Sequence, residues 1–185
     1  LTTKKEVYAR EAATDWHHRV YTIGEPIGGN RVQHCIETLG LWDRLDAKCK
    51  IEIILHSPGG EVLPGIALFD FIRELERRGH HITTHVLGYA ASLAGVLLQA
   101  GTHRVMGRES YVLIHETSGQ VGGKMGDIED TSLFLKKLEA RMVDIFMERV
   151  QGKISRAAFV KRCKRKDWWL DSGECLKLGF VDEVV

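Results

Sequence analysis

The chain has 185 residues, 44% of them hydrophobic and 28% charged, which is enough for one soluble globular domain with a substantial core. Its 26 basic and 25 acidic residues give a net charge of +1, which excludes a strong overall attraction to nucleic acid or to acidic membranes. The chain has no secretory or membrane-length apolar run and its four cysteines lack CxxC spacing, so we expect free thiols in a reducing, cytoplasmic compartment and neither a zinc nor a redox site.

Strands alternate with helices along the chain. Residues 1–15 are polar without clear periodicity, so we expect a mobile arm or a short helix there, as part of an N-terminal arm at 1–18. Strands are expected at 19–23, 51–55, 82–87, 103–106 and 111–114. Helices are expected at 30–42, 61–79, 93–100, 127–151 and 154–166, with a tail after them. This alternation predicts an α/β fold with a largely parallel sheet in a single domain, 1–185.

Three polar residues stand where helices are expected to begin. Asn30, Asp127 and Ser155 are of the types that cap helix N-termini, so we expect them to be caps. The helix after Asp127 carries a narrow apolar seam over 128–145. Such a seam often packs against another subunit.

Ser92 lies where the strand at 82–87 gives way to an apolar helix, after a run of small residues that allows a sharp turn. Unpaired N–H groups and the dipole at a helix N-terminus favour developing negative charge, which suits a nucleophile. Serine is also a favoured N-cap, so this stretch alone leaves a nucleophile and an ordinary cap both open.

Three other features could converge with Ser92. His115 ends a strand, and the carboxyl ends of parallel strands gather at one edge of a sheet. Gly59 and Gly60 follow a strand and could let N–H groups approach a ligand, although a tight turn explains them as well. Asp167 precedes two tryptophans, which could partly bury its carboxylate, but taken singly a surface salt bridge with a neighbouring lysine is the favoured interpretation.

Two other clusters carry little functional signal. His81 and His85 are four apart but lie on a strand-like segment, so they cannot share one helical face as zinc ligands. The basic run at 161–166 has no accompanying nucleic-acid-binding motif and is interpreted as a solvated face or a subunit contact.

Several segments occur in an order and spacing that resembles the Clp protease proteolytic subunit family. They read His-Ser-Pro-Gly-Gly-Glu, Gly-Tyr-Ala-Ala-Ser-Leu-Ala-Gly, Leu-Ile-His-Glu, Gly-Gly-Lys-Met-Gly-Asp-Ile, Asp-Trp-Trp-Leu and Leu-Gly-Phe-Val-Asp. The resemblance extends from about residue 19 to 185. It implies a ClpP/crotonase-like spiral α/β fold with a parallel sheet core and a protruding strand-helix handle at 117–151.

The resemblance also implies a chemistry. Ser92 would be the nucleophile, His115 the general base and Asp167 its orienting partner, with an oxyanion hole from the N–H groups of Gly60 and Leu93. The implied activity is that of a serine endopeptidase that cleaves unfolded proteins or peptides inside an oligomeric chamber. No cofactor and no metal are implied.

The implied partners are copies of the same chain and polypeptide substrates. Relatives form heptameric rings, which stack as a tetradecamer, and an AAA+ unfoldase makes their activity ATP-dependent. Neither a nucleic acid nor a membrane is expected as a partner. Apolar residues such as Val62, Leu93 and Leu113 would line the substrate pocket and favour apolar side chains before the cut.

The sequence departs from the family pattern at several points. His56 stands where relatives usually carry Asn, Tyr89 where they often carry Gln, and Thr117 where they usually carry Pro. Residues 1–18 do not resemble the axial-loop segment that engages the unfoldase. Asp171 lies four residues from Asp167 and competes with it for the triad.

The departures fit a divergent bacterial subunit, an organelle homologue or a phage-encoded protease of capsid maturation. Besides the cytoplasm, an organelle or the cytoplasm of a phage-infected host is therefore a further expected location. Three rival functions stay open: a signal-peptide-peptidase-like protease, a crotonase-like acyl-CoA enzyme and a non-catalytic structural ring subunit.

Overall fold

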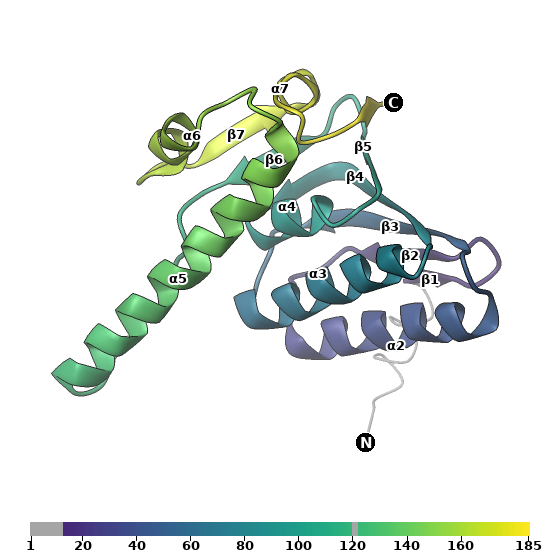
Figure 1. Ribbon diagram of the computed structural model, residues 1–185, viewed down its shortest axis with the longest axis horizontal. Coiled ribbons are helices and arrows are strands. Elements are labelled where there is room, and N and C mark those ends of the chain that lie inside the picture. The colour runs from purple at the N-terminus through teal and green to yellow at the C-terminus, as the bar shows by residue number, and fades with distance from the viewer. Residues whose placement is uncertain (1–12, 120–121) are drawn as a thin grey trace.

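The computed structural model describes residues 13–119 and 122–185 (Figure 1). Most of the arm expected at 1–18 therefore lies outside the described residues. Its end forms a short strand, β1 (Thr14–Asp15), which pairs antiparallel with β2 (Val20–Ile23). At these two residues the alternative of a short helix is wrong, because β1 adds an edge strand to the sheet.

A mostly parallel sheet forms the centre of the molecule. The described strands follow the order β1-β2-β3-β4-β5-β8, and β6 pairs with both β4 and β7. Among these described strands, only β1 and β7 pair antiparallel with their neighbours. The remaining strands are β3 (Lys50–Ser57), β4 (His81–Ala91), β5 (His103–Met106), β6 (Tyr111–Ile114), β7 (Trp168–Asp171) and β8 (Glu183–Val184). The predicted α/β fold with a largely parallel sheet is confirmed.

Strand β4 is longer than predicted and divides between two partners. Its first part, Thr83 to Val86, pairs with β5, and its last part, Tyr89 to Ala91, pairs with β6. Gly88 lies between the two parts with φ +85°, a conformation that glycine adopts easily. The expected end at residue 87 is wrong because the chain finds this second partner. As a result β4 and β6 run side by side to the same edge, where Ser92 and His115 follow them.

Six helices among the described residues flank the sheet, and α2 and α3 pack together along it (Figure 1). None of the described helices is long and apolar enough to cross a membrane. The helices are α2 (Gly29–Leu45), α3 (Val62–Arg77), α4 (Leu93–Leu98), α5 (Met125–Val150), α6 (Arg156–Cys163) and α7 (Ser172–Leu178).

One of the three predicted helix caps is confirmed. Ser155 caps α6 by accepting a hydrogen bond from the N–H of Ala158 at 3.2 Å. Helix α2 instead begins after Gly28, so Asn30 is already inside it. Helix α5 begins after Lys124, and Asp127 lies in its first turn, where its carboxylate accepts the Lys124 N–H at 3.3 Å.

The predicted tail is structured. Strand β7 and helix α7 occupy most of it, followed by β8. These elements were missed because each is short and draws its support from the sheet rather than from its own periodicity.

The core lies between the sheet and the helices that cover it. Side chains of β3 alternate between buried and less buried positions, and the apolar faces of α2 and α3 meet the sheet. The largest fully buried side chains include Trp42, Tyr21, Phe159, Phe180, Ile23, Leu39, Ile53 and Leu55.

Helix α5 projects away from the rest of the molecule (Figure 1). Its buried residues lie in its C-terminal half, from Val143 to Val150, whereas Leu133 and Phe134 in its first half are exposed. Between His115 and Met125 the described residues form no strand, so the expected strand of the handle is not seen there.

A buried arginine on β5 binds the C-terminal segment to the sheet through hydrogen bonds and an ion pair. The Arg104 guanidinium donates to the Asp182 carboxylate, to Gln99 Oε1 at 3.1 Å and to the Gly179 carbonyl at 2.7 Å. Burial opposes ionisation of Asp182, but the hydrogen bonds and charge of Arg104 outweigh it and lower the pKa of that carboxyl below its ordinary value. This ion pair therefore adds stability above about pH 4, which is lost as the pH falls through the lowered pKa.

Substituting Arg104→Met is expected to lower the free energy of unfolding by about 3 kcal/mol, because it leaves a partly buried carboxylate and buried carbonyls unpaired. Urea unfolding at pH 7 measures the change. The control is Arg77→Met, since the Arg77 side chain is 72% exposed in its pair with Glu74, and its effect should stay within about 0.5 kcal/mol. Equal effects of the two substitutions would contradict the prediction.

Candidate active site

Ser92 occupies a strained turn between β4 and α4. Its backbone has φ +54° and ψ −122°, a positive φ that non-glycine residues rarely adopt. Such strain often marks a functional position, and a nucleophile on a sharp strand-to-helix turn is one example. Although Ser92 stands at the N-cap position of α4, its side chain makes no capping hydrogen bond. The hydroxyl is therefore not used as an ordinary cap.

The turn formed by Gly59 and Gly60 presses against the Ser92 peptide. A Cβ on Gly59 would lie 2.6 Å from the Ala91 oxygen and 2.9 Å from the Leu93 nitrogen, so only glycine fits there. The turn is held by Ile27, whose N–H donates to the Gly59 oxygen at 2.8 Å. Within 13–119 and 122–185, the N–H groups of Gly60 and Leu93 have no hydrogen-bond acceptor. Both donors are thus available to a ligand oxygen.

Substituting Gly59→Ala is expected to lower kcat/KM for peptide hydrolysis by about 10²–10³-fold, the usual cost of losing an oxyanion donor. The new methyl group must displace the turn from the Ser92 peptide, and the φ of +90° adds strain. Kinetics on a fluorogenic peptide measure the effect. The control is Gly29→Ala, because a Cβ there meets nothing within 4 Å in the first turn of α2. A Gly59→Ala protein with unchanged kinetics would contradict the prediction.

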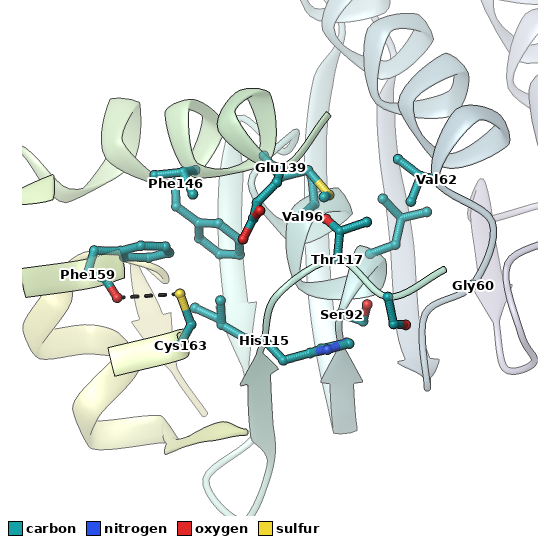
Figure 2. A pocket seen from close by; sticks show the side chains of 15 residues that line it. Gly60, Val62, Ser92, Val96, His115, Thr117, Glu139, Phe146, Phe159 and Cys163 are labelled. Carbon is teal, nitrogen blue, oxygen red and sulfur yellow. Dashed lines mark hydrogen bonds between the residues drawn. The ribbon is translucent and has the colours of Figure 1, made fainter. Parts of the chain in front are cut away.

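His115 follows β6 directly and is half-buried. Figure 2 shows its ring pointing toward the Ser92 side chain, and both residues line one pocket together with Gly60 and Leu93. The N–H of Ser92 donates to the Leu113 oxygen at 2.8 Å, which ties the turn to the strand that carries the histidine. Among the described residues no hydrogen bond joins the two side chains. Such bonds often tighten only when substrate binds.

Strand register separates the two aspartates that competed for the triad. In the antiparallel pair of β6 and β7, Ile114 lies opposite Trp168, so the next positions are His115 and Asp167. Asp171 lies opposite Tyr111, at the other end of β6. Of the two aspartates, Asp167 is therefore the one whose backbone position continues the register toward His115.

The local contacts agree with this assignment. Asp171 caps α7, where its carboxylate accepts the Glu174 N–H at 2.8 Å. The loop before Asp167 is anchored beside His115 because the Arg165 N–H donates to Glu116 Oε2 at 2.7 Å. Asp167 itself is exposed and does not line the pocket, and no hydrogen bond to His115 is present among the described residues.

The pocket beside Ser92 extends under α5 and α6. It encloses about 610 Å³, its open mouth included. Val62 and Leu93 line it as expected, but Leu113 does not. Most of the wall comes from residues that the sequence did not indicate, which are Val96, Ile114, Met142, Val143, Phe146, Phe159 and Cys163, together with the polar Thr117, Ser118 and Glu139.

Two of the departures from the family pattern contact each other. The rings of His56 and Tyr89 meet edge to face with centroids 4.9 Å apart, and His56 Nδ1 lies 2.8 Å from the Leu87 oxygen. The two unusual residues therefore pack against each other. Among the described residues, no group of three or more His, Cys, Asp or Glu side chains is arranged to hold a metal ion.

A family model described as Clp protease matches residues 5–185. The chain belongs to the Clp protease family. The resemblance seen in the motifs is thereby confirmed over nearly the whole chain. Its activity is that of a serine-type endopeptidase, and the match to the Clp protease model speaks against a crotonase-like acyl-CoA enzyme.

Curated relatives of this Clp protease agree with the family model. It is 27% identical to the ATP-dependent Clp protease proteolytic subunit of Deinococcus radiodurans, over 90% of this chain and 80% of the relative. It is 27% identical to proteolytic subunit 2 of Thermobifida fusca, over 97% and 86% respectively. Identity to proteolytic subunit 2 of Chlamydia pneumoniae is 29%, over 90% and 80%.

Proposed function

We propose that this Clp protease cleaves polypeptides with Ser92 as nucleophile, His115 as general base and Asp167 as the group that orients His115. The observation that carries the proposal is the strained turn at Ser92, whose hydroxyl caps nothing and faces the His115 ring across one pocket (Figure 2). The register of β6 and β7 supports Asp167 as the third member.

The mechanism follows from these positions. Ser92 Oγ attacks the scissile carbonyl carbon, and its proton passes to the His115 imidazole. The carbonyl oxygen becomes an oxyanion and accepts hydrogen bonds from the N–H groups of Gly60 and Leu93, each worth about 3 kcal/mol in the transition state. Collapse of the intermediate expels the amine, which takes the proton from His115 and leaves an acyl ester on Ser92.

Water completes the cycle. His115 removes a proton from the water as it attacks the ester, and returns that proton to Ser92 Oγ when the acid product leaves. The Asp167 carboxylate fixes the imidazole tautomer and stabilises the imidazolium that forms in each half of the cycle. The reaction needs no cofactor and no metal ion.

We further propose that the chain, a single domain with a handle at 117–151, assembles as heptameric rings stacked into a tetradecamer. The projecting half of α5 supports this, because Met125, Leu133 and Phe134 leave 72%, 57% and 46% of their surface exposed on one protomer. The relatives are named as subunits of an ATP-dependent protease, which supports an AAA+ unfoldase as a second partner. The described cysteines are free and buried, in keeping with a cytoplasmic location.

The proposed function is tested with one substrate protein that is supplied in its folded and in its unfolded form. An unfolded substrate should be degraded without a partner, while its folded form should resist because it cannot enter the chamber. Light scattering on the same sample should give fourteen times the 20.9 kDa of one chain. Equal degradation of the folded and unfolded forms, or a monomeric mass, would contradict the chamber. A Ser92→Ala protein that still degrades the unfolded substrate would contradict the triad.

A further inference from the structure

One carboxylate lies in an otherwise largely apolar pocket beside Ser92. Glu139 is half-buried on α5, and Figure 2 shows its side chain leaving the helix toward the pocket, between Phe146 and Thr117. Its neighbours along the wall include Val62, Val96, Met142, Val143, Phe146 and Phe159. Glu139 therefore gives the pocket a charge that its walls do not balance.

The Glu139 carboxylate has no partner among the described residues. No hydrogen bond and no ion pair joins it to any side chain or backbone group of that part of the chain. Other acids of α5 do have partners, such as Asp144 with Arg156. The negative charge of Glu139 also acts on Cys163, which lines the same pocket. Burial raises the pKa of the Cys163 thiol, and the Glu139 charge adds to that rise.

A second polar group in the same pocket also lacks a partner. Thr117 Oγ1 is buried and has no hydrogen bond to any described residue. A hydroxyl can accept as well as donate, whereas a carboxylate only accepts. The pocket thus offers acceptors at the carboxylate and the hydroxyl, and apolar contact along the rest of its wall.

The complementary ligand has a long apolar stem and a terminal group rich in donors and positive charge. A lysine side chain has these properties, because four methylene groups carry an ammonium with three donors. Burying an unpaired charge is costly, so a pocket carboxylate rewards a cation and penalises an apolar end group. Carboxylates at the base of serine-protease pockets select basic side chains for this reason.

We propose that Glu139 and Thr117 make this pocket select lysine as the residue before the scissile bond, an inference that rests on the proposed function. The lysine stem lies along Val62, Val96 and Phe146, and its ammonium donates to Glu139 and to Thr117 Oγ1. This proposal replaces the expectation of an apolar side chain before the cut, which was drawn from the apolar wall residues alone, with a basic side chain that has an apolar stem.

The test uses the full chain and fluorogenic peptides that differ only before the cut, with lysine, norleucine, glutamine or glutamate. Norleucine reproduces the lysine stem without its charge. We expect kcat/KM to be at least about 10-fold higher for lysine than for norleucine, as one satisfied buried charge allows. In Glu139→Gln this ratio should fall about 10-fold, because hydrolysis of the lysine peptide slows while the norleucine peptide is hydrolysed at least as fast as by the parent, which reports intact folding.

A matched control comes from the same helix. Glu148 is an acid on α5 that pairs with Arg141, leaves 59% of its side chain exposed and does not line the pocket, so Glu148→Gln should keep the lysine preference. Ser92-dependent hydrolysis without a preference for lysine, or a preference that survives Glu139→Gln, would overturn the specificity alone. Absence of Ser92-dependent hydrolysis of every peptide would overturn the proposed function, and the specificity with it.

Discussion

Substituting Ser92→Ala is expected to lower kcat/KM for peptide hydrolysis by about 10⁴–10⁶-fold, because the attacking oxygen is lost while the rest of the pocket remains. His115→Ala should cost about as much, since without a base the Ser92 hydroxyl is a weak nucleophile. The double substitution should be no worse than either single one, because the two side chains act as one unit.

Kinetics on one fluorogenic peptide, with each variant checked for an unchanged mass by light scattering, measure these losses. Ser118→Ala is the matched control, since Ser118 lines the same pocket but follows no strained turn and lies three residues beyond His115. Its kcat/KM should stay within about 3-fold of the parent, as expected for a surface hydroxyl. A Ser92→Ala protein that keeps a tenth of the activity would show that another residue is the nucleophile.

Substituting Asp167→Asn is expected to lower kcat/KM by about 10³–10⁴-fold, whereas Asp171→Asn should change it by less than about 3-fold. Asparagine in place of Asp167 favours the wrong imidazole tautomer and cannot stabilise the imidazolium. At position 171 the native role is to cap α7, and asparagine caps helices as well as aspartate does. The same peptide kinetics distinguish the two positions.

The stability of both variants provides the control for this comparison. Asp167 is exposed and Asp171→Asn preserves a cap, so both proteins should unfold at the same urea concentration as the parent. A large loss of activity in Asp171→Asn with little effect of Asp167→Asn would reverse the assignment and contradict the register argument.

Much of the fold was predictable because its elements have strong local signals. The apolar strand at β3 and the amphipathic helix at α3 were predicted within a few residues of their observed ends. Elements whose stability comes from neighbours could not be found this way. Strand β4 continues to Ala91 only because β6 receives it, and the short β7 and α7 are held by the sheet.

The same division applies to the site. Ser92, His115 and the glycine turn could be singled out because each follows a strand, and parallel strands deliver such residues to one edge. Their catalytic roles, and the choice of Asp167 over Asp171, came from the family resemblance. The register of β6 and β7, which no single sequence displays, adds an independent argument for Asp167. Glu139 was not identified because helix periodicity does not tell which residues of α5 reach across to the pocket.

The central claim is that Ser92 is an activated nucleophile in the native protein. Reaction with a fluorophosphonate probe, followed by intact mass and peptide mapping, tests this without any assumption about substrate, partner or specificity. We expect one probe per chain, attached to Ser92, and no labelling of Ser92→Ala or His115→Ala. A folded, oligomeric protein that stays unlabelled, or one labelled at a serine other than Ser92, would contradict the account.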